Sequence, residues 1–203
     1  MWKAFVFGVI VAGAIGPIAL LIFSTGARRG FAAGAFAGLG AALADLLYAL
    51  AAFLAGALVL PYLTDHERAI ETGCALLLVG LGAWMLIGQV RTGDGPAVPQ
   101  AAAHAFLPTF LLTVVNPLTF VMFAGVVPQL PVAGSVATAS GLALALAAGS
   151  ATINVAIGAC GAVLGRALPG ERGRRAISAL AALGILAFGV AGLAAAWRSG
   201  AVI

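Results

Sequence analysis

Charged residues are scarce in this sequence. Asp, Glu, Lys and Arg make up 8% of its 203 residues, whereas hydrophobic residues make up 63%. Soluble domains carry roughly one quarter charged residues, so a domain that folds in water is excluded. The length suits about six helices of roughly 20 residues each, the length that spans a bilayer. The composition therefore predicts an all-α integral membrane protein, with one transmembrane domain over residues 1–203 and the lipid bilayer as its surroundings.

Residue types that catalyse reactions or hold metals are also few. Cys74 and Cys160 each lie alone in an apolar run, so the chain lacks a CxxC redox pair and a thiolate metal site. Its two histidines, His66 and His104, lie at the edges of apolar segments. A GxxxxGKS/T loop for ATP does not occur. We therefore expect no enzyme, no cofactor and no resident metal, and any energy that the protein needs has to come from an ion gradient or a separate subunit.

The sequence does contain a series of apolar segments separated by charges and turn residues. They cover residues 4–25, 32–60, 70–90, 104–127, 135–164 and 176–197. Each is long enough to cross a bilayer as a helix. The sequence therefore predicts about six transmembrane helices.

Basic residues are distributed unequally over the two faces that alternating spans create. The first, third and fifth connections hold seven of them, Arg28, Arg29, Arg91, Arg166, Arg172, Arg174 and Arg175, whereas the opposite face holds Lys3, Arg68 and Arg198. Basic connections face the cytoplasm, so we expect the odd connections inside the cell and both termini outside. Because orientation accounts for these residues, we expect no nucleic-acid partner.

Asp45 is an acidic residue well inside a span. It lies about 15 residues beyond Gly30, on the order of 22 Å along a helix and hence near the middle of the membrane. An acid there costs roughly 2.5 to 3.5 kcal/mol on insertion scales, so it should face other helices or a water-filled cavity and have a partner. Small residues share its helix face, namely Gly30, Gly34, Gly38, Ala42 and Ala49. Close packing on that face directs Asp45 into the bundle.

Two roles for Asp45 remain open. In the first, the carboxyl is tied to Tyr48, to a Thr or Asn of another span or to a loop arginine, and only holds helices together. In the second, it handles substrate or protons. The first role predicts that transport follows the amount of folded protein, and the second predicts loss of transport without loss of folding.

Proline interrupts two of the expected spans at similar depth, at Gly16-Pro17 in the first and at Asn116-Pro117 in the fourth. Proline lacks a backbone donor but suits the first position of a new helix, where Gly or Asn is a fitting cap. Each span is then two half-helices. A half-helix that starts at Pro17 or Pro117 presents free N–H groups and the positive end of its dipole to a carboxylate. An ordinary proline kink is the alternative.

The two interruptions correspond when the chain is divided into residues 4–90 and 104–197. Each half has three spans, so the halves are opposite in topology, as in the inverted repeats of many secondary transporters. Asp45 and Asn154 both lie among small residues in the second span of their half. The sequence therefore allows two inverted three-helix repeats, with Asn154 as a candidate counterpart of Asp45.

Two ordered motifs resemble the lysine exporter type of amino-acid efflux transporter. The first is GPIALLIFSTGARRGFAAGAFAGLGAALADLLYALAA from Gly16, and the second is NPLTFVMFAGVVPQL from Asn116. The resemblance implies that Gly16, Pro17 and Asp45 carry over from the first motif, and Asn116 and Pro117 from the second. It also implies a multi-pass protein of the bacterial inner (plasma) membrane.

The resemblance and the residues together predict a secondary exporter of amino acids or similar small zwitterions, driven by the proton gradient. Asp45 would lie near the substrate amino group or carry the coupling proton, and the half-helix ends would lie near its carboxylate. Tyr48 and Asn154 complete the expected substrate and proton pathway. A heavy-metal cation exporter of the same superfamily is the alternative, and a Gly-rich helix face allows a homodimer.

Overall fold

The computed structural model describes residues 1–14, 16–65, 67–91, 101–116, 119, 123, 135–168 and 170–199. Helices make up its regular structure, in the order α1 (Trp2–Gly13), α2 (Pro17–Arg29), α3 (Phe31–Asp65), α4 (Glu67–Arg91), the short 3-10 helix η1 (Ala102–Ala105), α5 (Phe106–Val114), α7 (Val136–Ala167) and α8 (Glu171–Ser199). In chain order they coincide with the six apolar segments of the sequence. The first segment contains α1 and α2, and the fourth begins with η1 and α5.

Several of these helices are long and apolar enough to cross a membrane. Phe31–Leu54, Val136–Ala167 and Arg175–Trp197 each pass this test alone, and α1 and α2 pass it together as one broken span. Thr72–Ile87 and Ala102–Val114 are shorter apolar helices. The predicted all-α membrane fold is confirmed. By length and composition, the described part of the chain supplies three or four of the about six expected spans.

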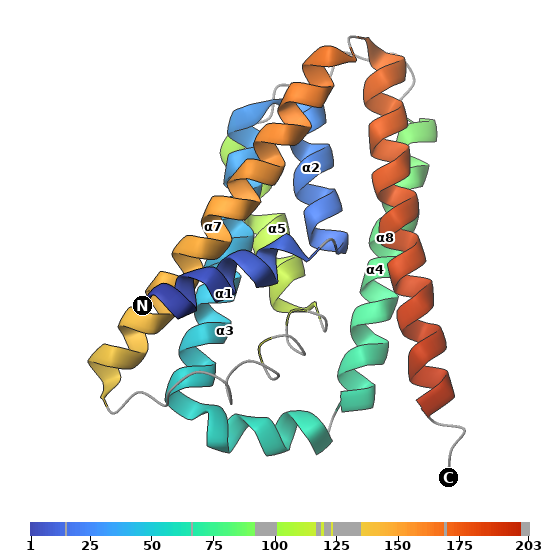
Figure 1. Cartoon of the computed structure of the whole chain (residues 1–203). Coiled ribbons are helices and arrows are strands. Elements are labelled where there is room, and N and C mark those ends of the chain that lie inside the picture. The colour runs from blue at the N-terminus through green and yellow to red at the C-terminus, as the bar shows by residue number, and fades with distance from the viewer. Residues whose placement is uncertain are drawn as a thin grey trace.

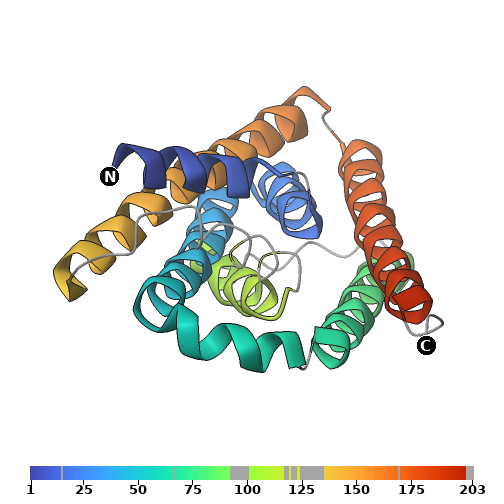
Figure 2. The same cartoon turned by 60° about the horizontal axis from the view of Figure 1, so that its bottom comes forward.

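Helix α7 is the main packing partner of the first half of the chain. It crosses α3 along much of its length and also contacts α1 and α2, while α5 packs on α3. Figure 2 shows α2 and α5 enclosed by the other helices. Helices α4 and α8 pack on each other as a pair, and α8 joins the rest of the bundle through α2 (Figure 1).

Glycines bring helix backbones into direct contact. A methyl group added at Gly161 of α7 would lie 2.1 Å from the Phe23 carbonyl oxygen of α2, and one added at Gly40 of α3 would lie 2.4 Å from the Phe106 carbonyl oxygen of α5. Gly34 and Gly38 meet the α7 backbone in the same way. The prediction that the small-residue face of α3 packs into the bundle is confirmed at Gly34, Gly38, Ala42 and Ala49, all of which are buried.

Gly30 is the exception on that face. It lies in the turn between α2 and α3 with a φ of 86°, and no heavy atom lies within 4 Å of the position that its Cβ would take. A side chain strongly disfavours this backbone conformation. Gly30 therefore serves the turn and not helix packing.

The first predicted helix break is confirmed. Helix α1 ends at Gly13, Gly16 has an extended backbone, and Pro17 is the first residue of α2. The axes of α1 and α2 differ by 76°, too much for an ordinary proline kink in one continuous helix. In the fourth span, α5 ends at Val114 and Asn116 follows outside the helix. Pro117 lies outside the described residues.

Candidate functional site

A small cavity lies where the start of α2 and the end of α5 face α3 and α7. Its volume is about 50 Å³. Small or apolar residues form part of its wall, namely Val11, Ala12, Ala14, Gly16, Ile18, Ala19 and Ala41. Polar residues form the remainder, namely Asp45, Thr113, Asn116, Thr119 and Asn154. The cavity thus combines a carboxyl, an amide and two helix ends inside an apolar bundle.

The carboxyl of Asp45 has a hydrogen-bonded support on α7. The Ser150 hydroxyl donates to Asp45 Oδ2, and Asn154 Nδ2 donates to Ser150 Oγ at 3.0 Å. Ser150 is fully buried, and Asp45 and Asn154 are each 4% exposed. The three side chains therefore form a chain of hydrogen bonds across the α3–α7 contact.

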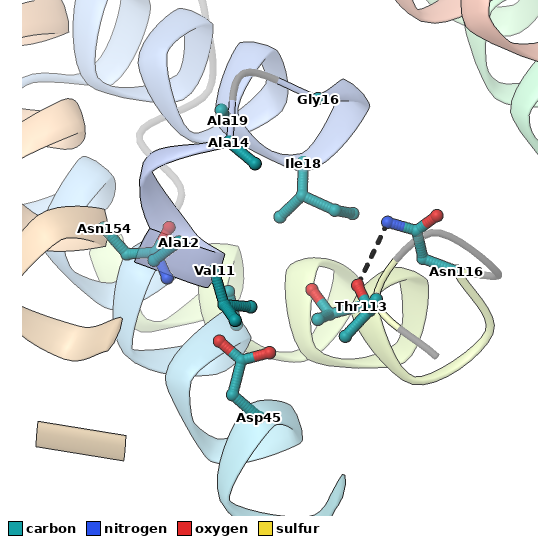
Figure 3. A pocket seen from close by; sticks show the side chains of 12 residues that line it. Val11, Ala12, Ala14, Gly16, Ile18, Ala19, Asp45, Thr113, Asn116 and Asn154 are labelled. Atoms are coloured by element: carbon teal, nitrogen blue, oxygen red, sulfur yellow. Dashed lines mark hydrogen bonds between the residues drawn. The ribbon is translucent and has the colours of Figure 1, made fainter. Parts of the chain in front are cut away.

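The other oxygen of this carboxyl is available to a ligand. Within the described part of the chain, Asp45 Oδ1 accepts no hydrogen bond. Figure 3 shows the Asp45 carboxyl pointing into the cavity toward Thr113, with Val11 beside it. A buried carboxyl oxygen without a donor is costly to keep, so this atom is suited to accept a hydrogen bond from a ligand or to bear a proton.

The start of α2 forms the opposite wall. Gly16, Ile18 and Ala19 line the cavity, and no described side chain caps this helix. Leu20 N–H bonds to the Gly16 carbonyl at 3.2 Å, whereas the N–H groups of Ile18 and Ala19 belong to the first turn, where a helix has no internal acceptors. The positive end of the α2 dipole therefore faces the cavity, a favourable position for an anion.

The end of α5 brings further polar groups to the cavity. Asn116 Nδ2 donates to Thr119 Oγ1 at 3.2 Å, and the Thr113 hydroxyl donates to the Thr109 carbonyl at 2.8 Å. Thr113, Asn116 and Thr119 are all at least nine-tenths buried. Figure 3 places Thr113 and Asn116 across the cavity from Asn154.

The structure brings most of the residues that the sequence predicted into one place. Gly16, Asp45, Asn116 and Asn154 line the same cavity, and Pro17 lies buried at its edge. Tyr48 is not among the lining residues, because its hydroxyl bonds to the Val114 carbonyl at the end of α5. Pro117 lies outside the described residues.

Sequence reasoning missed Ser150, Thr113 and Thr119. The expected partners of Asp45 were Tyr48, a Thr or Asn of another span, or a loop arginine, and this expectation is wrong because the partner is Ser150. A usable signal was present, since Ser150 and Asn154 are four residues apart and therefore share a helix face. Across the described residues, His, Cys, Asp and Glu form no group of three that could hold a metal ion.

Apolar helices of spanning length, one broken span formed by α1 and α2, and a buried polar cavity among the helices define a multi-pass membrane protein of the transporter class. The chain matches the LysE type translocator family over residues 9–195, and it belongs to that family. The predicted resemblance is thereby confirmed. The chain is a translocator of small molecules and not an enzyme.

Two further comparisons returned no match. Neither a curated protein nor a solved structure matches this chain.

Proposed function

We propose that this translocator exports amino acids or similar small zwitterions in exchange for protons. One observation carries the proposal: the Asp45 carboxyl and the uncapped start of α2 line the same cavity. A zwitterion carries an ammonium group and a carboxylate a few bonds apart. The acid suits the ammonium group, and the helix start suits the carboxylate.

Proton coupling follows from competition for one group. The Asp45 carboxyl lines the cavity, and its Oδ1 accepts no hydrogen bond from the described residues, so a proton and a substrate ammonium group compete for the same carboxyl. Protonation removes the charge that holds the ammonium group. Binding of a proton to Asp45 therefore opposes binding of the substrate, and exchange of protons for substrate requires this competition.

The cavity has to open for substrate to enter. At roughly 10–15 Å³ for each water, a volume of about 50 Å³ holds on the order of three to five waters. Every amino acid that has a side chain contains more heavy atoms than that. The described conformation is therefore too narrow for a bound amino acid, and the site has to widen during an alternating-access cycle.

The orientation and the repeat are parts of the same proposal. The odd connections face the cytoplasm, and the two halves of the chain are inverted three-helix repeats. In such a repeat, α1 and α2 correspond to α5, α3 corresponds to α7, and α4 corresponds to α8. Helix packing supports this correspondence, because α3 packs on α7, α4 packs on α8, and the contacts of α1 and α2 with α7 match the contact of α5 with α3.

Efflux from proteoliposomes tests the proposal. Vesicles are loaded with a labelled mixture of the common amino acids, and their loss is followed with and without an imposed pH gradient. We expect the parent protein to export a subset of the mixture faster with the gradient, and Asp45→Asn to abolish this gain while keeping its yield and thermal stability. Asp94→Asn, which changes an acid outside the expected spans, is the matched control. Efflux by Asp45→Asn at the parental rate and pH profile, or efflux of Zn²⁺ or Cd²⁺ with no amino acid released, would contradict the proposal.

A further inference from the structure

Backbone carbonyls at the end of α5 have no hydrogen-bond donor within their own helix. The last turn of any α-helix has carbonyls that no following N–H reaches, and inside an apolar bundle water does not replace those donors. Here the N–H groups of Val115 and Asn116 bond to the carbonyls of Leu111 and Thr113, at 3.1 and 3.2 Å. The carbonyls of Val114 and Val115 come last, next to the cavity residue Asn116.

Two other helices supply donors to these last carbonyls. The Tyr48 hydroxyl of α3 donates to the Val114 carbonyl, and the Cys74 thiol of α4 donates to the Val115 carbonyl. Cys74 is 8% exposed and Val115 is 39% exposed, so this contact is partly buried. The Tyr48 ring also stacks on Phe123, with ring centroids 5.5 Å apart and an angle of 27° between the planes. Side chains of α3 and α4 thus close the end of α5.

This closure acts on the cavity through the chain itself. Thr113 and Asn116 line the cavity, and they flank Val114 and Val115 in sequence. A shift of either carbonyl therefore moves the polar wall that faces Asp45. We propose that Tyr48 and Cys74 are positioning residues, which hold the end of α5 so that Thr113 and Asn116 keep their place in the substrate site. The substrate part of this statement rests on the proposed function.

Cys74 adds a connection that Tyr48 does not. Helix α4 packs chiefly on α8 among the described helices, outside the group of helices that lines the cavity. The thiol contact with Val115 links this outer pair directly to the site. A displacement of α4 would therefore move Val115 and its neighbour Asn116 directly, without acting through Asp45.

Hydrogen exchange tests the closure without any substrate. The variants are Tyr48→Phe, which keeps the ring but loses the donor, Cys74→Ala, which loses the donor, and Cys74→Ser, which keeps one. Cys160→Ala changes the exposed cysteine of α7 and is the control. We expect amides of residues 111–116 to exchange about two- to tenfold faster in Tyr48→Phe and Cys74→Ala, the loss expected for one hydrogen bond. Cys74→Ser and Cys160→Ala should match the parent, and a peptide from the start of α2 should not change.

Transport kinetics then test positioning. For the amino acid exported fastest from the loaded mixture, Tyr48→Phe and Cys74→Ala should raise KM by a similar factor at unchanged maximal rate, and Cys74→Ser should restore the parental KM. Exchange at residues 111–116 that is unaltered in both donor-loss variants would overturn the closure. Faster exchange with an unaltered KM, or a Cys74→Ser variant as impaired as Cys74→Ala, would overturn the positioning role. If the parent exports no amino acid, the proposed function fails, and the exchange measurement still decides whether the closure exists.

Discussion

Replacing Gly161 by Ala is expected to destabilise the protein through a single methyl group. The added Cβ would lie 2.1 Å from the Phe23 carbonyl oxygen, 2.9 Å from its carbonyl carbon and 3.1 Å from its Cα. All three atoms belong to the α2 backbone, so no side chain can rotate away. Helices α2 and α7 would have to separate by roughly 1.4 Å to bring this Cβ to an ordinary contact distance of about 3.5 Å from the Phe23 oxygen.

The expected loss follows from that separation. Overpacking of a well-packed interior costs typically 1–3 kcal/mol, and in a chain of this size 1 kcal/mol changes Tm by about 2–4 °C. We therefore expect Gly161→Ala to lower Tm by roughly 2–12 °C. Gly80→Ala is the matched control, because a Cβ at Gly80 of α4 would have no heavy atom within 4 Å. Alanine is the better helix former by up to about 1 kcal/mol, so the control should keep or raise Tm.

Thermal unfolding of the two purified variants in the same detergent checks this reasoning. The same chemical change should move Tm in opposite directions, or at least by clearly different amounts. A Gly161→Ala variant as stable as Gly80→Ala would show that α2 and α7 are not in backbone contact in the folded protein.

Three further predictions concern other parts of the bundle. Ser150→Ala removes the donor to Asp45 and should lower the free energy of unfolding by about 1–3 kcal/mol, measured as a fall in Tm, and an unaltered Tm would remove Ser150 as the partner. Ser178→Ala removes a hydrogen-bond acceptor of Arg28, whose guanidinium donates to Ser178 Oγ at 3.0 Å. It should lower Tm by about 2–4 °C without altering the KM for efflux, because the residue is not among those that line the cavity. Single cysteines introduced at Gly93 and Gly200 of a cysteine-free variant should be labelled from opposite sides of the membrane by an impermeant reagent, and labelling of both from one side would refute the proposed orientation.

Features that depend on local chemistry were predictable from the sequence. A proline after glycine fits the start of a helix better than its interior, so the break at Pro17 could be located without knowing the fold. The inward direction of Asp45 followed from the small residues that share its helix face. The chain's place in a membrane followed from composition alone.

Features that depend on how helices cross were not predictable. Ser150 meets Asp45 because α3 and α7 approach at Gly38, where an added Cβ would lie 2.8 Å from the Asn154 backbone. The four-residue spacing of Ser150 and Asn154 shows that the two share a helix face, but it does not reveal that α3 meets that face at Asp45. The role of Tyr48 likewise depends on where α5 ends, and the residues around Asn116 do not specify which helix will supply a donor there.

The two ends of α5 are held in different ways. At its start, the Phe106 carbonyl lies directly against Gly40, where even a methyl group would not fit. At its far end, the contacts of the described residues include the tips of two side chains, those of Tyr48 and Cys74. If α5 turned as a rigid body, the tight contact at Phe106 would be its pivot. Since Asn116 lies about 15 Å farther along the chain, a rotation of about 10° would carry it about 2–3 Å away from Asp45. A turn of this size would therefore widen the site without separating α7 from α2 and α3.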